Sequence, residues 1–294
     1  MSADLHCHTK LSDGSLGIED LIMLAKKKGI STIAITDHDC LAGTVRGKII
    51  GDRYGVQVIP GVELSATDEQ TGKNVHIICY LSDAPDRLEG LCHRNSLSRK
   101  KAAHYMMLQL TKRYPVSSEF IIKCATGSTN IYKQHMMQAL MECGFTTTIY
   151  GDLYDTLFKK ETPGNILYSP KYPDIVDILT AIHDAGGVAV LAHPYILDCL
   201  DSIPRLVENG LDGIEVWHPS TTEEQRAELK KIAAKNKLIM TGGTDFHGLY
   251  NRYNVSVGDC EVPDDAVTKL LGYKSRQKRL AKKAQRELDA ENAV

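Results

Sequence analysis

Histidines and carboxylates in this chain gather at the ends of short β-like runs. In His6-Cys7-His8, the alternation of side chains along a strand places both imidazoles on one face and Cys7 on the other. Two imidazoles on one face, two residues apart, can bind one metal ion, and Cys7 is expected to pack in the interior. Residues of the same ligand type recur in the following turn and at an end of each later run: Asp13, His38, Glu63, His76, His193, His218, Asp245 and His247.

The runs that carry these residues alternate with segments of helical periodicity. About seven strands separated by helices are typical of a parallel α/β barrel or sheet. In such a barrel the C-terminal strand ends meet at one rim, so ligands far apart in the chain should converge there. The strands are predicted at 3–9, 31–36, 56–60, 75–81, 187–192, 213–217 and 238–241.

The middle and the end of the chain depart from this alternation. Residues 83–162 show helical patterns with little strand, which predicts a helical subdomain inserted between barrel segments 1–82 and 163–273. Residues 264–294 predict one long polar helix, and its part 274–294 is a basic tail with seven basic residues from Lys274 to Arg286. A solvated face is the simplest interpretation of this tail, and a nucleic-acid or phosphate-rich partner is the alternative.

The composition excludes several classes of protein. The chain has 294 residues, 43% hydrophobic, with 35 Lys+Arg against 37 Asp+Glu, which argues against a globally basic nucleic-acid binder and against an acidic disordered chain. No apolar stretch approaches the roughly 20 residues that cross a bilayer, and no secretory signal is visible. The eight cysteines include no CxxC pair. We therefore expect a cytoplasmic protein with reduced thiols and no membrane partner.

Six motifs, taken in order, resemble those of the PHP family, the polymerase and histidinol phosphatase superfamily. They are DLHCHTKLSDG (4–14), TDHD (36–39), PGVELS (60–65), VHIICY (75–80), AHP (192–194) and GGTDFHG (242–248). The layout is most similar to the stand-alone bacterial phosphoesterases of that family, some of which hydrolyse nucleoside 3′,5′-bisphosphates or short oligonucleotides. The resemblance implies an α/β fold, a distorted seven-stranded (β/α) barrel with an inserted helical subdomain, and a site for two or three metal ions.

The resemblance also implies which residues hold each ion. The first ion would be bound by His6, His8, Glu63 and Asp245, the second by Asp13, His38 and His247, and the third by His76 and His193, with Glu63 as a bridge. Six imidazoles and three carboxylates suit Zn²⁺, Mn²⁺ or Fe²⁺ better than Mg²⁺.

The charge of such a site points to the substrate. With three ions the ligand set would keep a charge of about +3, which favours a phosphate dianion. A metal-bridging hydroxide could then attack phosphorus in line without a serine or cysteine nucleophile. Asp245 is expected to take part in catalysis, and so is His218, which could bind phosphate or protonate the leaving oxygen. Packing beside Trp217 is the structural alternative for His218.

Basic residues of the insert are expected to face the substrate. Related enzymes often carry Gly-Arg-x-His near the phosphate, where this chain has Tyr132-Lys133-Gln134-His135. Lys133 would replace a bidentate arginine with a point charge. We expect Lys133 and His135 to bind substrate, together with Arg94 and Arg99 of the first insert helix, although an exposed helical face is the alternative for each arginine.

The leading hypothesis is a metal-dependent phosphoesterase acting on a small nucleotide, such as a nucleoside 3′,5′-bisphosphate, or on a short oligonucleotide. Histidinol-phosphatase activity would use the same metal core, but the helical insert favours the nucleotide-type enzymes. A non-catalytic metal-binding PHP module is the third interpretation, and loss of ligands would be expected there. A short single strand gripped by the basic tail would be compatible with the leading hypothesis.

Overall fold

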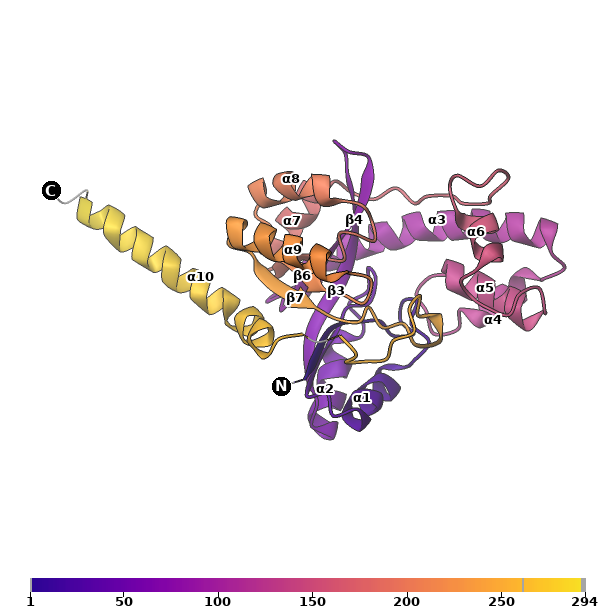
Figure 1. Cartoon of the computed structure of the whole chain (residues 1–294), viewed down its shortest axis with the longest axis horizontal. Coiled ribbons are helices and arrows are strands. Elements are labelled where there is room, and N and C mark those ends of the chain that lie inside the picture. The colour runs from indigo at the N-terminus through magenta and orange to yellow at the C-terminus, as the bar shows by residue number, and fades with distance from the viewer. Residues whose placement is uncertain (1, 261, 292–294) are drawn as a thin grey trace.

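The computed structural model describes residues 2–260 and 262–291 and contains one seven-stranded sheet in the order β1 to β7. The sheet curls into a half-barrel, with helices packed against it (Figure 1). The prediction of seven strands in an α/β fold is confirmed. The strands are β1 (Ala3–Cys7), β2 (Thr32–Ile35), β3 (Gln57–Asp68), β4 (Lys73–Tyr80), β5 (Val188–Leu191), β6 (Gly213–Trp217) and β7 (Ile239–Gly242).

The expected all-parallel arrangement is wrong at β4. This strand runs antiparallel to both β3 and β5, whereas the other neighbouring pairs are parallel. The reason is the connection: β3 turns directly into β4, with Asp68 paired to Lys73, and a tight hairpin reverses the chain where a helical crossover would not. Glu63 in the middle of β3 and His76 near the start of β4 therefore reach the same region.

The two outer strands of the curled sheet meet beside the histidines. Cys7 and Phe246 form an isolated parallel bridge, and the backbone N–H of His8 donates to the carbonyl of Phe246 at 2.9 Å. Residues that follow β1 and β7 thus lie together although about 240 positions separate them. Cys7 itself is buried in a hydrophobic cluster, as expected.

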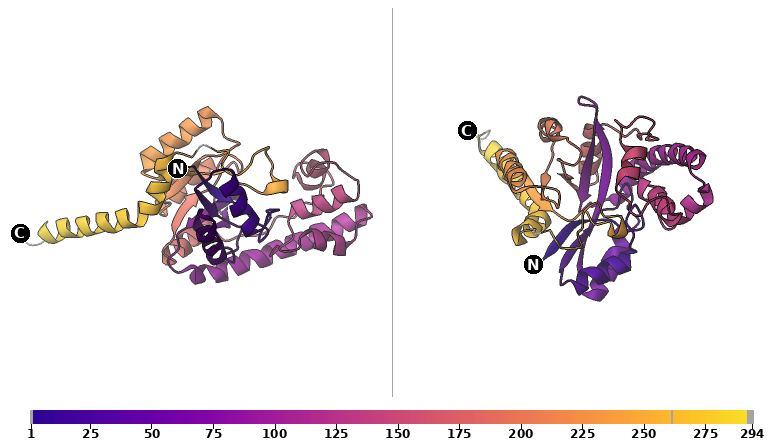
Figure 2. Two further views of the ribbon diagram at one scale, coloured as in Figure 1. Left: turned by 90° about the horizontal axis from the view of Figure 1, so that it is seen from below. Right: turned by 45° about the vertical axis from the view of Figure 1, so that its right-hand side comes forward.

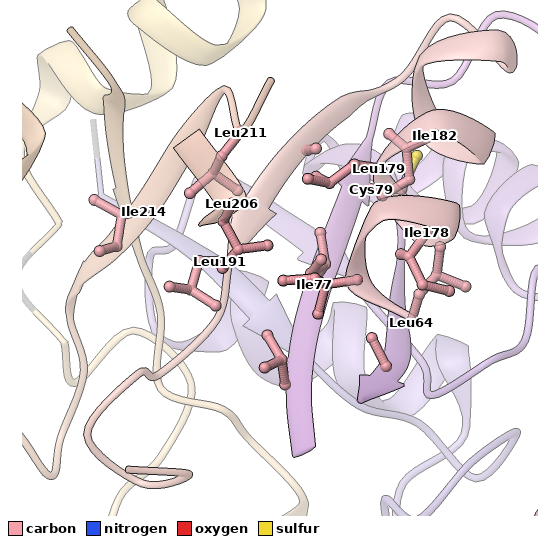
Figure 3. Close-up of a cluster of buried hydrophobic side chains, with 14 of the residues drawn as sticks. Leu64, Ile77, Cys79, Ile178, Leu179, Ile182, Leu191, Leu206, Leu211 and Ile214 are labelled. Carbon is pink, nitrogen blue, oxygen red and sulfur yellow. The ribbon is translucent and has the colours of Figure 1, made fainter. Parts of the chain in front are cut away.

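Helices bury their apolar faces against the sheet. In α1 (Ile18–Lys27) the residues Ile18, Leu21, Ile22 and Ala25 are buried, in the spacing of one helix face. The α9 helix (Glu223–Asn236) follows the cap residue Thr222, whose side chain accepts from the Gln225 N–H. The largest hydrophobic cluster joins β3, β4 and β5 to helices on one face (Figure 3). The other helices of this part are α2 (Thr44–Tyr54), α7 (Ile175–Asp184) and α8 (Ile203–Glu208), with short 3₁₀ turns η1 (Pro85–Leu88), η2 (Leu200–Ser202) and η3 (Gly248–Tyr250).

The middle of the chain is helical and has its own hydrophobic cluster. It contains α3 (Glu89–Arg113), α4 (Ser118–Cys124), α5 (Lys133–Glu142) and α6 (Asp152–Phe158). Met106, Met136 and Leu140 lie in this cluster, while Leu91 at the start of α3 belongs to the cluster of the sheet. One continuous helix therefore links the two parts. The division into domains at residues 83 and 162 stays a prediction.

The last helix, α10 (Asp264–Glu291), is anchored to the barrel at its base. Leu270 is buried, the Tyr273 hydroxyl donates to Asp212 at 2.7 Å, and Lys274 pairs with Asp83 at 2.7 Å. Beyond this point the helix projects from the barrel on the side opposite the insert (Figures 1 and 2). The predicted long polar helix is confirmed over the described residues; positions 292–294 lie outside them. Among the described helices, none has the length and apolarity to cross a membrane.

Candidate metal centre

Glu63 lies at the centre of the clustered histidines and is fully buried. Its two carboxylate oxygens together contact five imidazoles. Oε2 lies 3.3 Å from His6 Nε2, 3.2 Å from His8 Nε2 and 3.1 Å from His38 Nδ1, and Oε1 lies 2.9 Å from both His76 Nδ1 and His193 Nε2.

One group of four ligand atoms has nearly equal spacing. His6 Nε2 and His8 Nε2 are 3.1 Å apart, and they lie 3.4 and 3.1 Å from Asp245 Oδ1. With the Glu63 contacts above, all measured separations fall between 3.1 and 3.4 Å. A tetrahedral site with metal–ligand bonds of about 2.0–2.1 Å has ligand–ligand distances of about 3.3 Å. The spacing therefore fits the first predicted ligand set.

A second group surrounds Asp13. Its Oδ1 lies 3.2 Å from His247 Nε2 and 3.8 Å from His8 Nδ1, and its Oδ2 lies 3.9 Å from His38 Nε2. These four residues are close enough to hold one ion, so the structure brings together the second predicted set and adds His8 to it.

The third predicted set meets at one oxygen of Glu63. His76 and His193 both contact Oε1, but the compact third group consists of His38, Glu63 and His76. All nine predicted ligands thus lie in one cluster, drawn from β1, β3, β4 and the segments after β1, β2, β5 and β7. Their roles as ligands stay a prediction.

Several buried atoms of this cluster have no hydrogen-bond partner. They include Asp13 Oδ1, His38 Nδ1 and His76 Nδ1, although both imidazole nitrogens lie within 3.1 Å of Glu63. Buried polar atoms are normally satisfied, so this set of unpaired carboxylate oxygen and imidazole nitrogen atoms needs a partner. Imidazole and carboxylate atoms at this spacing fit divalent cations.

The imidazoles of the cluster differ in how strongly they hold a proton, since burial together with His8 and His76 brings the pKa of His38 well below its usual value. Burial alone would lower the pKa of His8, but its contacts with Asp245 and Glu63 raise it to about 10. Burial also works against ionisation of Glu63, yet the nearby imidazoles of His38, His76 and His6 bring its pKa well below the usual range. The carboxylates are therefore ionised, and protons on imidazoles balance part of their charge.

Sequence reasoning missed Glu215, a buried carboxylate on β6. His6 Nδ1 donates to its Oε1 at 3.1 Å, and the backbone N–H of His193 donates to its Oε2 at 2.9 Å. The first contact places the proton of neutral His6 on Nδ1 and leaves Nε2 available toward Glu63. The signal in the sequence was a charged residue inside the otherwise apolar run GIEVW.

We predict that Glu215→Gln weakens metal binding by about 10–100-fold, as loss of a carboxylate behind a ligating histidine usually does. Competition titration with a metal-sensitive dye would measure the affinity. Glu208→Gln, at an exposed position of α8, is the matched control. Unchanged affinity in the Glu215 variant would show that this carboxylate does not orient His6.

An open cavity borders the cluster. Asp13, His76, His193, Asp245 and His247 line it, and Gln134, Tyr154 and Arg252 form its outer part. The Gln134 amide donates to Asp13 Oδ2 at 3.0 Å. A second cavity adjoins the first, since both are lined by Asp13, His76, Gln134, Tyr154 and Leu197.

The four insert residues predicted to bind substrate lie in different environments. Lys133 and Arg99 line the second cavity, and Arg99 is paired with Asp39 at 2.8 Å. His135 is buried, and its Nδ1 accepts from the Tyr132 N–H, which caps α5. Arg94 is exposed on α3. Neither His135 nor Arg94 lines the two cavities, so only Lys133 and Arg99 have a place beside a ligand there.

His218 lies behind Asp245. Its Nδ1 accepts from the Ser220 N–H at 3.1 Å, so the proton of the neutral ring is on Nε2. Nε2 is 3.7 Å from Asp245 Oδ2 and has no hydrogen-bond partner. The ring contacts His193 and Tyr253 edge-on. His218 therefore offers an N–H beside a predicted metal ligand.

Comparisons with known proteins show the family of this chain. The model of the PHP domain family matches residues 4–188. A phosphoribosyl 1,2-cyclic phosphate 1,2-diphosphodiesterase of Eggerthella lenta is 38% identical over 256 residues, 86% of this chain and 96% of the relative. A 3′,5′-nucleoside bisphosphate phosphatase of Chromobacterium violaceum is 29% identical, over 83% of this chain and 86% of the relative. A structure from Bifidobacterium adolescentis, assigned as a metal-dependent phosphoesterase, superposes with a TM-score of 0.82 at 28% identity and covers 92% of this chain and 95% of that one. This chain belongs to the PHP family.

Proposed function

We propose that this protein is a metal-dependent phosphoesterase that hydrolyses a phosphate ester on a small ribose-containing compound, such as a nucleoside 3′,5′-bisphosphate. The observation that carries the proposal is the largely buried cluster of six imidazoles and three carboxylates beside an open cavity. The names of the two relatives support the substrate class, since both act on a ribose that carries phosphate ester bonds.

Two or three divalent cations would be held by His6, His8, Glu63 and Asp245, by Asp13, His38 and His247, and by His76 and His193 with Glu63. Zn²⁺, Mn²⁺ and Fe²⁺ suit this mixture of donors. Such ions supply a water nucleophile of lowered pKa and stabilise charge on the phosphoryl oxygens.

The chain's own residues position these parts. Glu63 connects the imidazoles of four strands through its two oxygens, and Glu215 holds His6 in one tautomer. His218 is fully buried and lines neither cavity, so its Nε2–H can donate to Asp245 and hold that carboxylate in place. Gln134 brings the insert against Asp13, so the insert forms one wall of the cavity.

The test is release of inorganic phosphate from adenosine 3′,5′-bisphosphate by the purified protein. We expect turnover that a chelator abolishes and Mn²⁺ restores. Histidinol phosphate in the same assay distinguishes the other PHP activity, and it should be a much poorer substrate. Absence of turnover with every phosphomonoester and cyclic phosphodiester of a panel would contradict the proposal and favour a non-catalytic module.

The position of α10 decides whether its basic part can contact a short oligonucleotide held in the cavity. Since the basic part of this helix projects away from the insert that lines the cavity, a di- or trinucleotide held there would not reach it (Figures 1 and 2). We predict that a chain ending after Gln277, which keeps the anchors Tyr273 and Lys274, cleaves such short strands as fast as the full chain.

Initial rates at low and high salt would measure this effect. If α10 did hold the strand, truncation would lower the rate and flatten its salt dependence, because each lysine–phosphate contact contributes to that dependence. Adenosine 3′,5′-bisphosphate serves as the control substrate for both chain lengths.

A further inference from the structure

Arg252 is a cation at the mouth of the site without an acidic partner. It lies in the loop that follows η3, and it lines the same cavity as Asp245 and His247. Its guanidinium lies over the ring of Tyr150, 5.8 Å from the centroid. Among the described residues no carboxylate forms an ion pair with it, and its side chain is exposed. A guanidinium held over an aromatic ring keeps its donors free for an anion.

Lys133 is a second such cation, across the adjoining cavity. Burial lowers its pKa to about 8, and the positive charges of Arg99 and Arg252 act in the same direction. Its ammonium lies 5.8 Å from the centroid of Phe158, and no carboxylate of the described residues pairs with it. Arg99, by contrast, is compensated by Asp39. The positive charges of Lys133 and Arg252 are therefore not neutralised by a carboxylate of the described residues, which leaves them available to an anion from outside the protein.

The two cations flank one continuous space. The cavity of Arg252 and the cavity of Lys133 share Gln134 and Tyr154 as lining residues. The first measures about 180 Å³. This volume is below the roughly 300–1,000 Å³ of small-molecule sites, so a ligand anchored at the histidines would extend past Tyr154 into the second cavity.

We propose that Arg252, assisted by Lys133, binds a second phosphate group of the substrate, one that is not cleaved. The inference rests on the proposed function and narrows its substrate class to ribose compounds with a phosphate dianion away from the scissile ester. Arg252 is then a specificity-determining residue: its fork of N–H donors matches phosphate oxygens, and the anion would neutralise the excess positive charge.

The test compares two substrates, adenosine 3′,5′-bisphosphate and adenosine 3′-monophosphate, which differ only in the second phosphate. We expect Arg252→Gln to lower kcat/KM for the bisphosphate by about 10–100-fold, mainly through KM, as loss of a charge-assisted hydrogen bond does. The rate with the monophosphate should change by less than about threefold, since its interactions are kept. Arg252→Lys should restore part of the effect, and Arg46→Gln, at an exposed position of α2, should leave both substrates unchanged.

Equal losses for both substrates, or no loss for either, would overturn the proposal. Absence of turnover by the wild-type chain would contradict the proposed function instead. A calorimetric comparison of adenosine 5′-monophosphate with adenosine then decides the subsite without catalysis. Preference for the nucleotide that is lost in Arg252→Gln supports it, and preference unchanged in the variant refutes it.

Discussion

Glu63→Gln is expected to lower kcat/KM for phosphate release by about 10³-fold or more. The carboxylate contacts five imidazoles from four parts of the chain, and it is fully buried. Glutamine keeps the shape but removes the negative charge and places an NH₂ group against nitrogen atoms that must face a cation. Metal ions contribute several kcal/mol to phosphoester hydrolysis, and each 1.4 kcal/mol is a factor of ten.

The metal content of the variant distinguishes loss of metal binding from misfolding as the cause of its lower activity. The variant should bind fewer divalent ions per chain by mass spectrometry, while its circular dichroism stays that of the wild type. Glu69→Gln, at the exposed hairpin just past β3, is the matched control and should keep full activity. If Glu63→Gln retained more than about a tenth of the activity with a full complement of ions, Glu63 would not be a bridging ligand.

Metal loading is expected to release protons and to become tighter as the pH rises. In the metal-free protein, burial opposes protonation of His6, His8, His193 and His247, but neighbouring carboxylates raise each pKa above 6.5. Cations bind the neutral imidazole, so they must displace these protons. Because the pKa of His8 is about 10, at least one proton is displaced throughout pH 6–8, and affinity should rise about tenfold per pH unit.

Titration calorimetry in buffers of different ionisation enthalpy would count the released protons. The stability of the metal-free fold changes with pH in the direction opposite to the metal affinity. The stabilisation from protonated His8 is complete below about pH 6.5 and is lost as the pH rises toward 10. The chelated protein should therefore lose stability over that range. A metal affinity independent of pH, with no proton release, would contradict the protonation described for this site.

Most strand ends could be predicted because periodicity is local, but β3 continues to Asp68, past its predicted end at residue 60. Apolar runs such as STIAIT specify a buried strand, and the residue after it must lie at the rim. The reversal of β4 was missed, since the strand pattern of 75–81 is the same in either direction. Only the short turn between Asp68 and Lys73, in the segment that separates the predicted strands 56–60 and 75–81, determines it.

Residues that act through long-range contacts could not be assigned from sequence. Glu215 is paired with His6, 209 positions away, and no local pattern connects them. In α5 the family motif pointed to His135, but a residue at the third position of a helix can fold back to cap the N-terminus, and His135 does so. Its neighbour Gln134 reaches Asp13 instead. Arg252 lies in a loop without periodicity, so the sequence does not predict which way its side chain points.

Crystals grown with Mn²⁺ and measured at the manganese absorption edge would test the central claim most directly. We predict at least two anomalous peaks within about 2.0–2.5 Å of nitrogen or oxygen atoms of this cluster, with Glu63 bound to at least one of them. Their absence at Glu63, in crystals of a protein that hydrolyses phosphate esters with Mn²⁺ present, would show that the reaction takes place elsewhere.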